Sequence, residues 1–203
     1  MSPKDEEQEQ AYLEQLPPLV RAAATGDLER ARALLAAGRS VNEADATGWT
    51  ALHAAATRRH PQIVRALLAA GADPDVTDSA GFTPLLNASG PGDSASVEAL
   101  LNAGADVAVS DIDNGWCPLS RAAEWDNFEV LTLLLAAGAD PNHDSPLVDA
   151  AEAGSLRCVR ALVAAGADPL TQIDGQTAAE YARSHHHDDV VAYLENLVAA
   201  ERC

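Results

Sequence analysis

The sequence is poor in lysine, aromatic residues and cysteine, and each shortage narrows what the chain can be. Lys4 is the only lysine, so a phosphate-binding loop of the GxxxxGK[ST] type is excluded and nucleotide binding has no support. Cys117, Cys158 and Cys203 are odd in number and follow no metal-binding or redox spacing. A disulfide framework is therefore not expected, and a reducing compartment fits the cysteine usage. Aromatics make up only 4% of the residues, and a core of small alanine, leucine and valine side chains predicts closely packed helices.

Targeting and catalytic signatures are also missing. No stretch approaches about eighteen consecutive apolar residues, and the N-terminal MSPKDEEQEQ is too acidic and polar for a secretory signal, so we expect a cytoplasmic protein. The sequence has no GxSxG elbow, no HExxH helix and no CxxC pair. Most carboxylates fall in turns, where Asp bonds local backbone N–H groups. We predict no catalytic residues, no cofactor and no small-molecule substrate, and hence a protein that is not an enzyme.

Acidic residues outnumber basic ones by 31 to 13, giving a formal net charge of −18. This charge repels phosphate backbones and anionic lipid headgroups, so neither nucleic acid nor a membrane surface is expected as a partner. A protein with a basic surface would be attracted, less so at high salt. The alternative is that the acidity only keeps the chain soluble.

A repeat is present along most of the chain. Leucine-rich segments such as LLAAG end in glycines separated by 33, 33, 34 and 28 residues, namely Gly38, Gly71, Gly104, Gly138 and Gly166. Glycine in this place is typical of a helix C-terminus that ends in a left-handed residue. Upstream of each leucine-rich segment lies a second apolar segment, usually preceded by Thr or Ser, which can cap a first helix. The spacing between the two segments is the same six times, so the sequence predicts six helix–turn–helix repeats.

The repeat resembles the ankyrin family. Thr50-Ala51-Leu52-His53-Ala54-Ala55 is close to that family's Thr-Pro-Leu-His-x-Ala motif, and Gly48-Trp49-Thr50 and Gly71-Ala72-Asp73 match the adjoining turns. The resemblance implies an all-α repeat solenoid of helix pairs with short β-hairpin fingers. It also implies a non-enzymatic role, in which a concave groove and the fingers bind a partner protein.

We expect an ankyrin-repeat domain at 17–198, between an acidic leader at 1–16 and a short tail at 199–203. Its six repeats are predicted at 17–43, 44–76, 77–109, 110–142, 143–170 and 171–198. The leader is predicted either to form a capping helix or to be a disordered acidic tail. The 28-residue step indicates that the fifth finger is deleted, and Gly90-Pro91-Gly92 predicts a shortened first helix in the third repeat.

Several residues are candidate partner contacts because the resemblance places them on fingers or on variable groove positions. Trp49, Phe82 and Trp116 occupy equivalent finger positions, where they either bind the partner or brace the fingers. Trp125, Arg58 and His185 occupy equivalent positions at the ends of first helices. Seven residues are predicted to border a notch beside the missing finger: Asp113, Asn114, Trp116, Trp125, Asp144, Asp149 and Glu152. Glu124, next to Trp125, is a further candidate contact. The alternative for the notch is drift in a repeat that tolerates loop deletion.

The sequence indicates a non-catalytic module that binds a basic protein segment. A narrower alternative is an inhibitor, immunity protein or dedicated chaperone that masks a basic enzyme or nucleic-acid-binding protein. A metal-dependent enzyme or sensor using His185, His186 and His187 is a third possibility, disfavoured because adjacent helical residues point about 100° apart. The repeat instead aligns His187 with His60 at the start of a second helix, and places His186 where a turn residue has positive φ.

Overall fold

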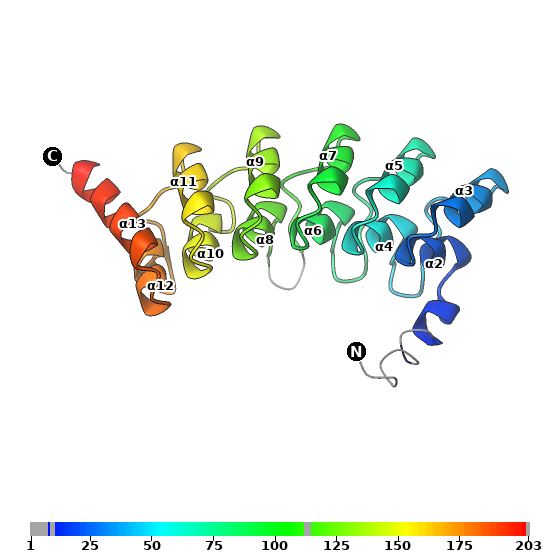
Figure 1. The fold of residues 1–203 in the computed structure, drawn as a ribbon, viewed down its shortest axis with the longest axis horizontal. Coiled ribbons are helices and arrows are strands. Elements are labelled where there is room, and N and C mark those ends of the chain that lie inside the picture. Colours follow the sequence, from blue (N-terminus) through cyan, green and yellow to red (C-terminus); the bar gives the residue numbers. More distant parts are fainter. Residues whose placement is uncertain (1–7, 9–10, 112–114, 202–203) are drawn as a thin grey trace. The chain divides into compact units, whose positions relative to one another are not determined.

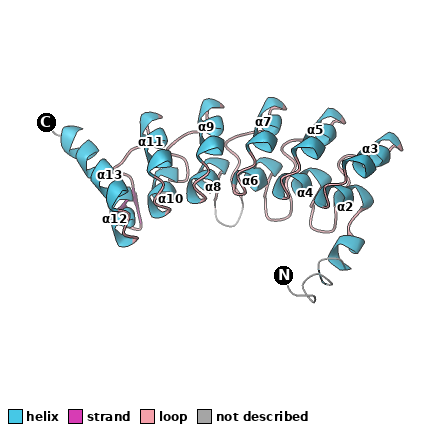
Figure 2. Cartoon of the chain, viewed as in Figure 1, coloured by secondary structure: helices cyan, strands magenta, loops and turns pink. Residues whose placement is uncertain are grey.

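The computed structural model describes residues 8, 11–111 and 115–201. Over these residues six helix pairs follow one another, joined by short loops (Figures 1 and 2). The pairs are α2 (Pro18–Ala24) with α3 (Leu28–Ala36), α4 (Ala51–Thr57) with α5 (Pro61–Ala69), α6 (Pro84–Ser89) with α7 (Ser94–Asn102), α8 (Pro118–Glu124) with α9 (Phe128–Ala136), α10 (Pro146–Glu152) with α11 (Leu156–Ala164), and α12 (Ala178–Ser184) with α13 (Asp188–Glu201). The predicted all-α repeat architecture is confirmed.

The chain divides into two compact units. Unit 1 comprises residues 1–88 and 95–105, and unit 2 comprises residues 89–94 and 106–203. In unit 1, α2 packs against α4, and in unit 2, α10 packs against both α8 and α12. First helices therefore stack on first helices within each unit, as stacked repeats require. The exact boundaries of the six repeats remain a prediction.

Side-chain caps at the N-termini of α4, α6, α8 and α12, together with buried small side chains, hold these first helices. Thr50 Oγ1 accepts from His53 N and the His53 ring accepts from Thr50 N, which makes a capping box for α4. Leu52, Ala54 and Ala55 of this helix are buried, because alanine lets neighbouring helices approach closely. Thr83, Cys117 and Thr177 accept equivalent bonds at the starts of α6, α8 and α12. The predicted capping role is confirmed for Thr50, Thr83 and Thr177, whereas the Cys117 cap was not predicted.

Leucines of the second helices complete the core of each repeat, and glycines end those helices. Leu67 of α5 is fully buried, and Leu134 of α9 and Leu162 of α11 are its counterparts in unit 2. At the end of α5, Gly71 has φ 87°, and Ala72 N bonds Leu67 O at 3.0 Å. This is a Schellman-type end, which requires the left-handed conformation that glycine adopts without strain.

Fingers are less regular than the resemblance implies. Among the described residues, the sixth finger alone has paired strands, β1 (Gln172–Ile173) and β2 (Gln176–Thr177), which are antiparallel. The second finger has an isolated bridge between Ala44 and Thr50, and the third is closed by a bond from Asp78 N to Phe82 O at 3.1 Å. The second and third fingers are thus closed by isolated backbone contacts, without paired strands.

The fifth repeat departs from the capping rule. Ser145 was expected to cap α10, but it has φ 54° and makes no side-chain cap bond. Asp144 before it also has positive φ, at 57°. A capping residue needs extended backbone geometry, and the tight left-handed turn between α9 and α10 does not provide it. The third repeat follows expectation, since α6 has six residues where α4 and α8 have seven.

Residues 11–15 are helical, and Leu16, which follows them, is buried. Most of the leader and the last two residues lie outside the described residues. None of the helices within the described part of the chain is long and apolar enough to cross a membrane.

Candidate protein-binding site

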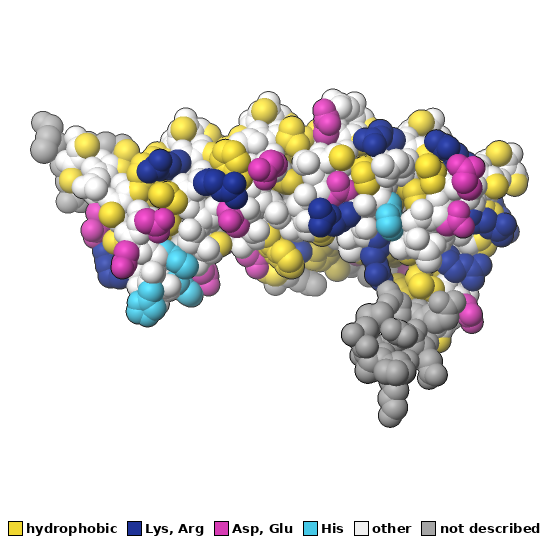
Figure 3. Space-filling model, in the orientation of Figure 1, with side chains coloured by type: hydrophobic (Ala, Val, Ile, Leu, Met, Phe, Trp, Pro, Cys, Tyr) yellow, Lys and Arg dark blue, Asp and Glu magenta, His cyan; other side chains and the backbone are white. Residues whose placement is uncertain are grey.

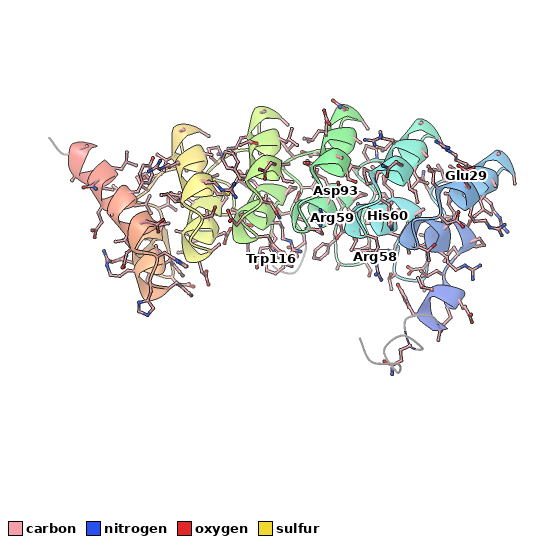
Figure 4. All side chains as sticks on the ribbon, in the orientation of Figure 1. Glu29, Arg58, Arg59, His60, Asp93 and Trp116 are labelled. Atoms are coloured by element: carbon pink, nitrogen blue, oxygen red, sulfur yellow. The ribbon has the colours of Figure 1, made fainter. Side chains whose placement is uncertain are left out.

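The candidate site is built around α8 and α10 of unit 2. Cys117 caps α8, with its sulfur accepting from Ser120 N, so Trp116 lies immediately before the first turn. Figure 4 labels Trp116 there. Glu124 is the last residue of α8, and the tight turn that follows includes Asp126 at φ 53°. The local sequence therefore places an indole at one end of α8 and a carboxylate at the other.

A hollow of about 450 Å³ lies beside these residues and is called the acidic hollow below. Its walls come from the finger before α8, from the ends of α8 and α10, and from the turn after α12. The lining residues are Trp116, Glu124, Asp149, Glu152, Ala153 and His185. Five of the predicted contact residues are thus brought together, and three of them, Trp116, Asp149 and Glu152, belong to the predicted notch.

Asp149 is the most buried carboxylate of the acidic hollow. Burial raises its pKa to about 7, a hydrogen bond with the Ser120 hydroxyl opposes that shift, and the negative charges of Asp144, Glu124 and Glu152 add to it. Glu124 and Glu152, in contrast, have side chains that are about half exposed. A cation entering the acidic hollow would relieve the repulsion among these carboxylates.

Arg121 connects the acidic hollow to Trp125. Its guanidinium lies 4.9 Å from the centre of the Trp116 ring and 5.9 Å from that of Trp125. The same group reaches Glu124 at 3.9 Å. Trp125 is 57% exposed, which agrees with the prediction that it is not a core residue. One cation therefore lies between two indoles and beside a carboxylate, an arrangement favoured by cation–π attraction.

The three consecutive histidines form the turn between α12 and α13, where Figure 3 shows histidines grouped on the surface. His186 has φ 62°, which confirms its predicted turn position. The His187 Nε2 lies 2.9 Å from Glu152 O, and the His185 Nε2 lies 3.6 Å from a Glu152 carboxylate oxygen. Within the described ranges, no group of three His, Cys, Asp or Glu side chains could hold a metal ion.

The remaining acidic candidates differ in placement. Asp144 is half-buried behind α8, where its carboxylate accepts from Cys117 N at 3.2 Å and its carbonyl accepts from Ser120 Oγ at 2.8 Å. Burial raises its pKa. Asp144 therefore supports the α8 start instead of lining the acidic hollow. Asp113 and Asn114 lie outside the described residues.

Two of the three candidates of unit 1 share a hollow. Trp49 and Arg58 line a smaller hollow of about 150 Å³ together with leader residues Tyr12, Leu13 and Leu16. Trp49 stacks on His53 at 5.1 Å between ring centres, so it also braces its finger.

Arg58 follows the last turn of α4 (Figure 4) and is exposed. Phe82 lines neither hollow, and its carbonyl lies 2.9 Å from the His53 Nε2. These three residues stay predicted contacts.

Sequence reasoning missed Arg121, Ala153 and Tyr12. The signal for Arg121 was present, because residues three and four apart on a helix are neighbours and Glu124 and Trp125 lie at those distances from it. Ala153 has no such signal, since a small residue that opens a hollow resembles any other alanine of the repeat.

Comparison with known proteins supports the repeat assignment. A family model described as ankyrin repeats (3 copies) matches residues 3–78 and 70–145, and a model of a single ankyrin repeat matches residues 142–173. A search of curated proteins found no match. Ankyrin repeats are generally protein–protein interaction modules. The repeated sequence pattern, the stacked helix pairs and the matches over most of the chain agree, and the chain belongs to the ankyrin-repeat family.

Proposed function

We propose that this chain is a non-catalytic module that binds a partner protein through an exposed basic segment, with the acidic hollow as its main contact. The observation that carries the proposal is the convergence of Glu124, Asp149 and Glu152 beside the indole of Trp116. Carboxylates give the surface its preference for cations, and an aromatic residue supplies contact area with little loss of conformational entropy. Trp125 extends this surface, because its side chain is exposed beside Arg121.

The charge of the whole chain supports the same kind of partner. At −18 it would speed the approach of a basic protein and repel nucleic acid and anionic membranes. Salt weakens such long-range steering, so partner association should slow as ionic strength rises.

The proposal is tested by comparing charge-neutral variants as baits in extracts of the native cells. Glu124→Gln with Glu152→Gln removes two negative charges from the acidic hollow while keeping side-chain shape. Glu129→Gln is the matched control, because Glu129 is an exposed residue of α9 in the same unit and does not line the acidic hollow. Captured proteins are identified by mass spectrometry. Each one is then purified and titrated against the three baits, which are the wild type, the double variant and the control.

The expected result is a partner whose affinity falls about tenfold or more with the double variant and stays within about twofold with the control. Cleavage of the partner's basic segment should abolish binding. A partner that binds the double variant as tightly as the wild type would contradict the proposed role of the acidic hollow.

A further inference from the structure

The acidic hollow combines features that suit one kind of side chain. Its volume of about 450 Å³ falls within the size range of small-ligand pockets. One wall is the indole of Trp116, and the carboxylates of Glu124, Asp149 and Glu152 come from two different helices. An occupant would therefore have an aromatic surface to stack on and several carboxylate oxygens to donate to.

The structure already contains one guanidinium group beside the hollow, that of Arg121. The Arg121 guanidinium stacks on Trp116 and lies beside Glu124, so this indole and this carboxylate together are compatible with a planar cation. Arg121 does not fill the hollow, because it is not among the lining residues and a volume of about 450 Å³ stays open beside it. The largest charge effects on Asp149 come from the carboxylates of Asp144, Glu124 and Glu152, so a second cation would be stabilised there. Glu124 also lies 3.9 Å from Arg121, and Glu152 lies 3.6 Å from the His185 ring.

Building on the proposed function, we propose that the acidic hollow receives the guanidinium of a single arginine side chain from the partner's basic segment. Arginine fits better than lysine for two reasons. Its planar group can stack on an indole, and its fork of N–H donors can bond two carboxylates at once, whereas the lysine ammonium is a compact, strongly hydrated charge. The hollow thus selects an arginine within a basic segment.

The test uses single-residue probes and the three tryptophans as reporters. Acetyl-arginine methylamide is titrated at pH 7.5 into the full-length protein labelled with nitrogen-15, and the same titration is run with the lysine and citrulline analogues. Citrulline is the matched control, since it has nearly the shape of arginine without the charge. The indole signals of Trp116 and Trp49 are compared, because Trp49 lies in unit 1 and does not line the acidic hollow.

We expect a saturable shift of the Trp116 indole and Ala153 amide signals with arginine, at least about fivefold weaker binding of lysine, and no saturable shift with citrulline. Glu124→Gln with Glu152→Gln should weaken arginine binding about tenfold, and Glu129→Gln should leave it unchanged. Equal binding of lysine, saturable binding of citrulline or absence of a saturable arginine shift would overturn the inference.

These outcomes are separable from those of the proposed function. If the wild type binds the arginine probe but the double substitution leaves partner capture unchanged, only the proposed function is rejected. Partner capture that depends on Glu124 and Glu152 without a preference for the arginine probe would reject the arginine assignment alone.

Discussion

Asp149, a residue of the proposed binding site, lowers the stability of the fold where its carboxyl is ionised. Its carboxyl lies among like charges on α8, on α10 and in the turn before α10, and burial raises its pKa to about 7. An unfolded chain leaves this carboxyl near its ordinary pKa of 3.8. The folded state therefore holds a proton that the unfolded state has lost between these two values, and this contribution to stability declines as the pH rises through that window. A binding site for cations is a reason to keep an ionisable residue at such a position.

Replacing Asp149 with asparagine should remove this pH dependence, because the amide stays neutral and has nearly the same shape. The free energy of unfolding of Asp149→Asn, relative to the wild type, should rise by roughly 2 kcal/mol between pH 5.5 and pH 8. Urea denaturation of both proteins at the two pH values measures this difference. Glu129→Gln serves as the control, and its difference from the wild type should not vary with pH by a comparable amount. A constant offset for Asp149→Asn would show that Asp149 keeps its ordinary pKa.

At the scale of elements, the turn between α10 and α11 positions the histidine turn against the acidic hollow. Gly154 in that turn has φ 72°, and a Cβ atom there would lie 2.5 Å from the His187 Nδ1. The Nε2 atom of the same His187 ring lies 2.9 Å from the backbone carbonyl oxygen of Glu152. The Glu152 side chain lines the acidic hollow. The glycine therefore serves two purposes, since it permits the left-handed turn and leaves room for the ring.

Gly154→Ala should destabilise the protein more than Gly175→Ala. Both glycines have positive φ, but a Cβ atom at Gly175 meets nothing within 4 Å. We expect a loss of roughly 1 kcal/mol for Gly175→Ala from backbone strain alone, and of roughly 2–3 kcal/mol for Gly154→Ala. Urea unfolding measures both losses. In a His187→Ala background the Gly154→Ala cost should fall to about that of Gly175→Ala, and an unchanged cost there would contradict a clash with the ring.

Also at the scale of elements, a repeated sequence pattern predicts the features that all repeats share and misses those of a single repeat. Helix pairs were predictable because glycine ends and Thr caps recur at fixed spacing. Ser145 was wrongly expected to cap α10, because the capping rule assumes extended backbone at that residue, whereas Ser145 is left-handed. Among the described residues, paired strands occur in the sixth finger and a single bridge in the second, because one or two backbone bonds depend on contacts that spacing does not reveal.

For the molecule as a whole, the site was predicted in part. Alignment of the repeats identified Trp116, Glu124, Asp149, Glu152 and His185, because equivalent positions of stacked repeats lie on one surface. It did not show that Asp144 is used behind α8, or that Arg121 lies between Trp116 and Trp125. Such details depend on side-chain rotamers and on the opening left beside Ala153, which no periodic pattern specifies. The excess of acidic residues predicts a basic partner but no place of contact.

The most direct test of the central claim is site-specific photo-crosslinking in the native cells. A benzophenone side chain replaces Ala153 in the acidic hollow, or Ala137, an exposed residue at the end of α9, as the control position. We predict that position 153 crosslinks to a segment rich in arginine and lysine in the partner, that excess unlabelled protein suppresses the adduct, and that position 137 gives no such product. Crosslinking of the partner from position 137 alone, or from position 153 to an acidic or neutral segment, would contradict the account.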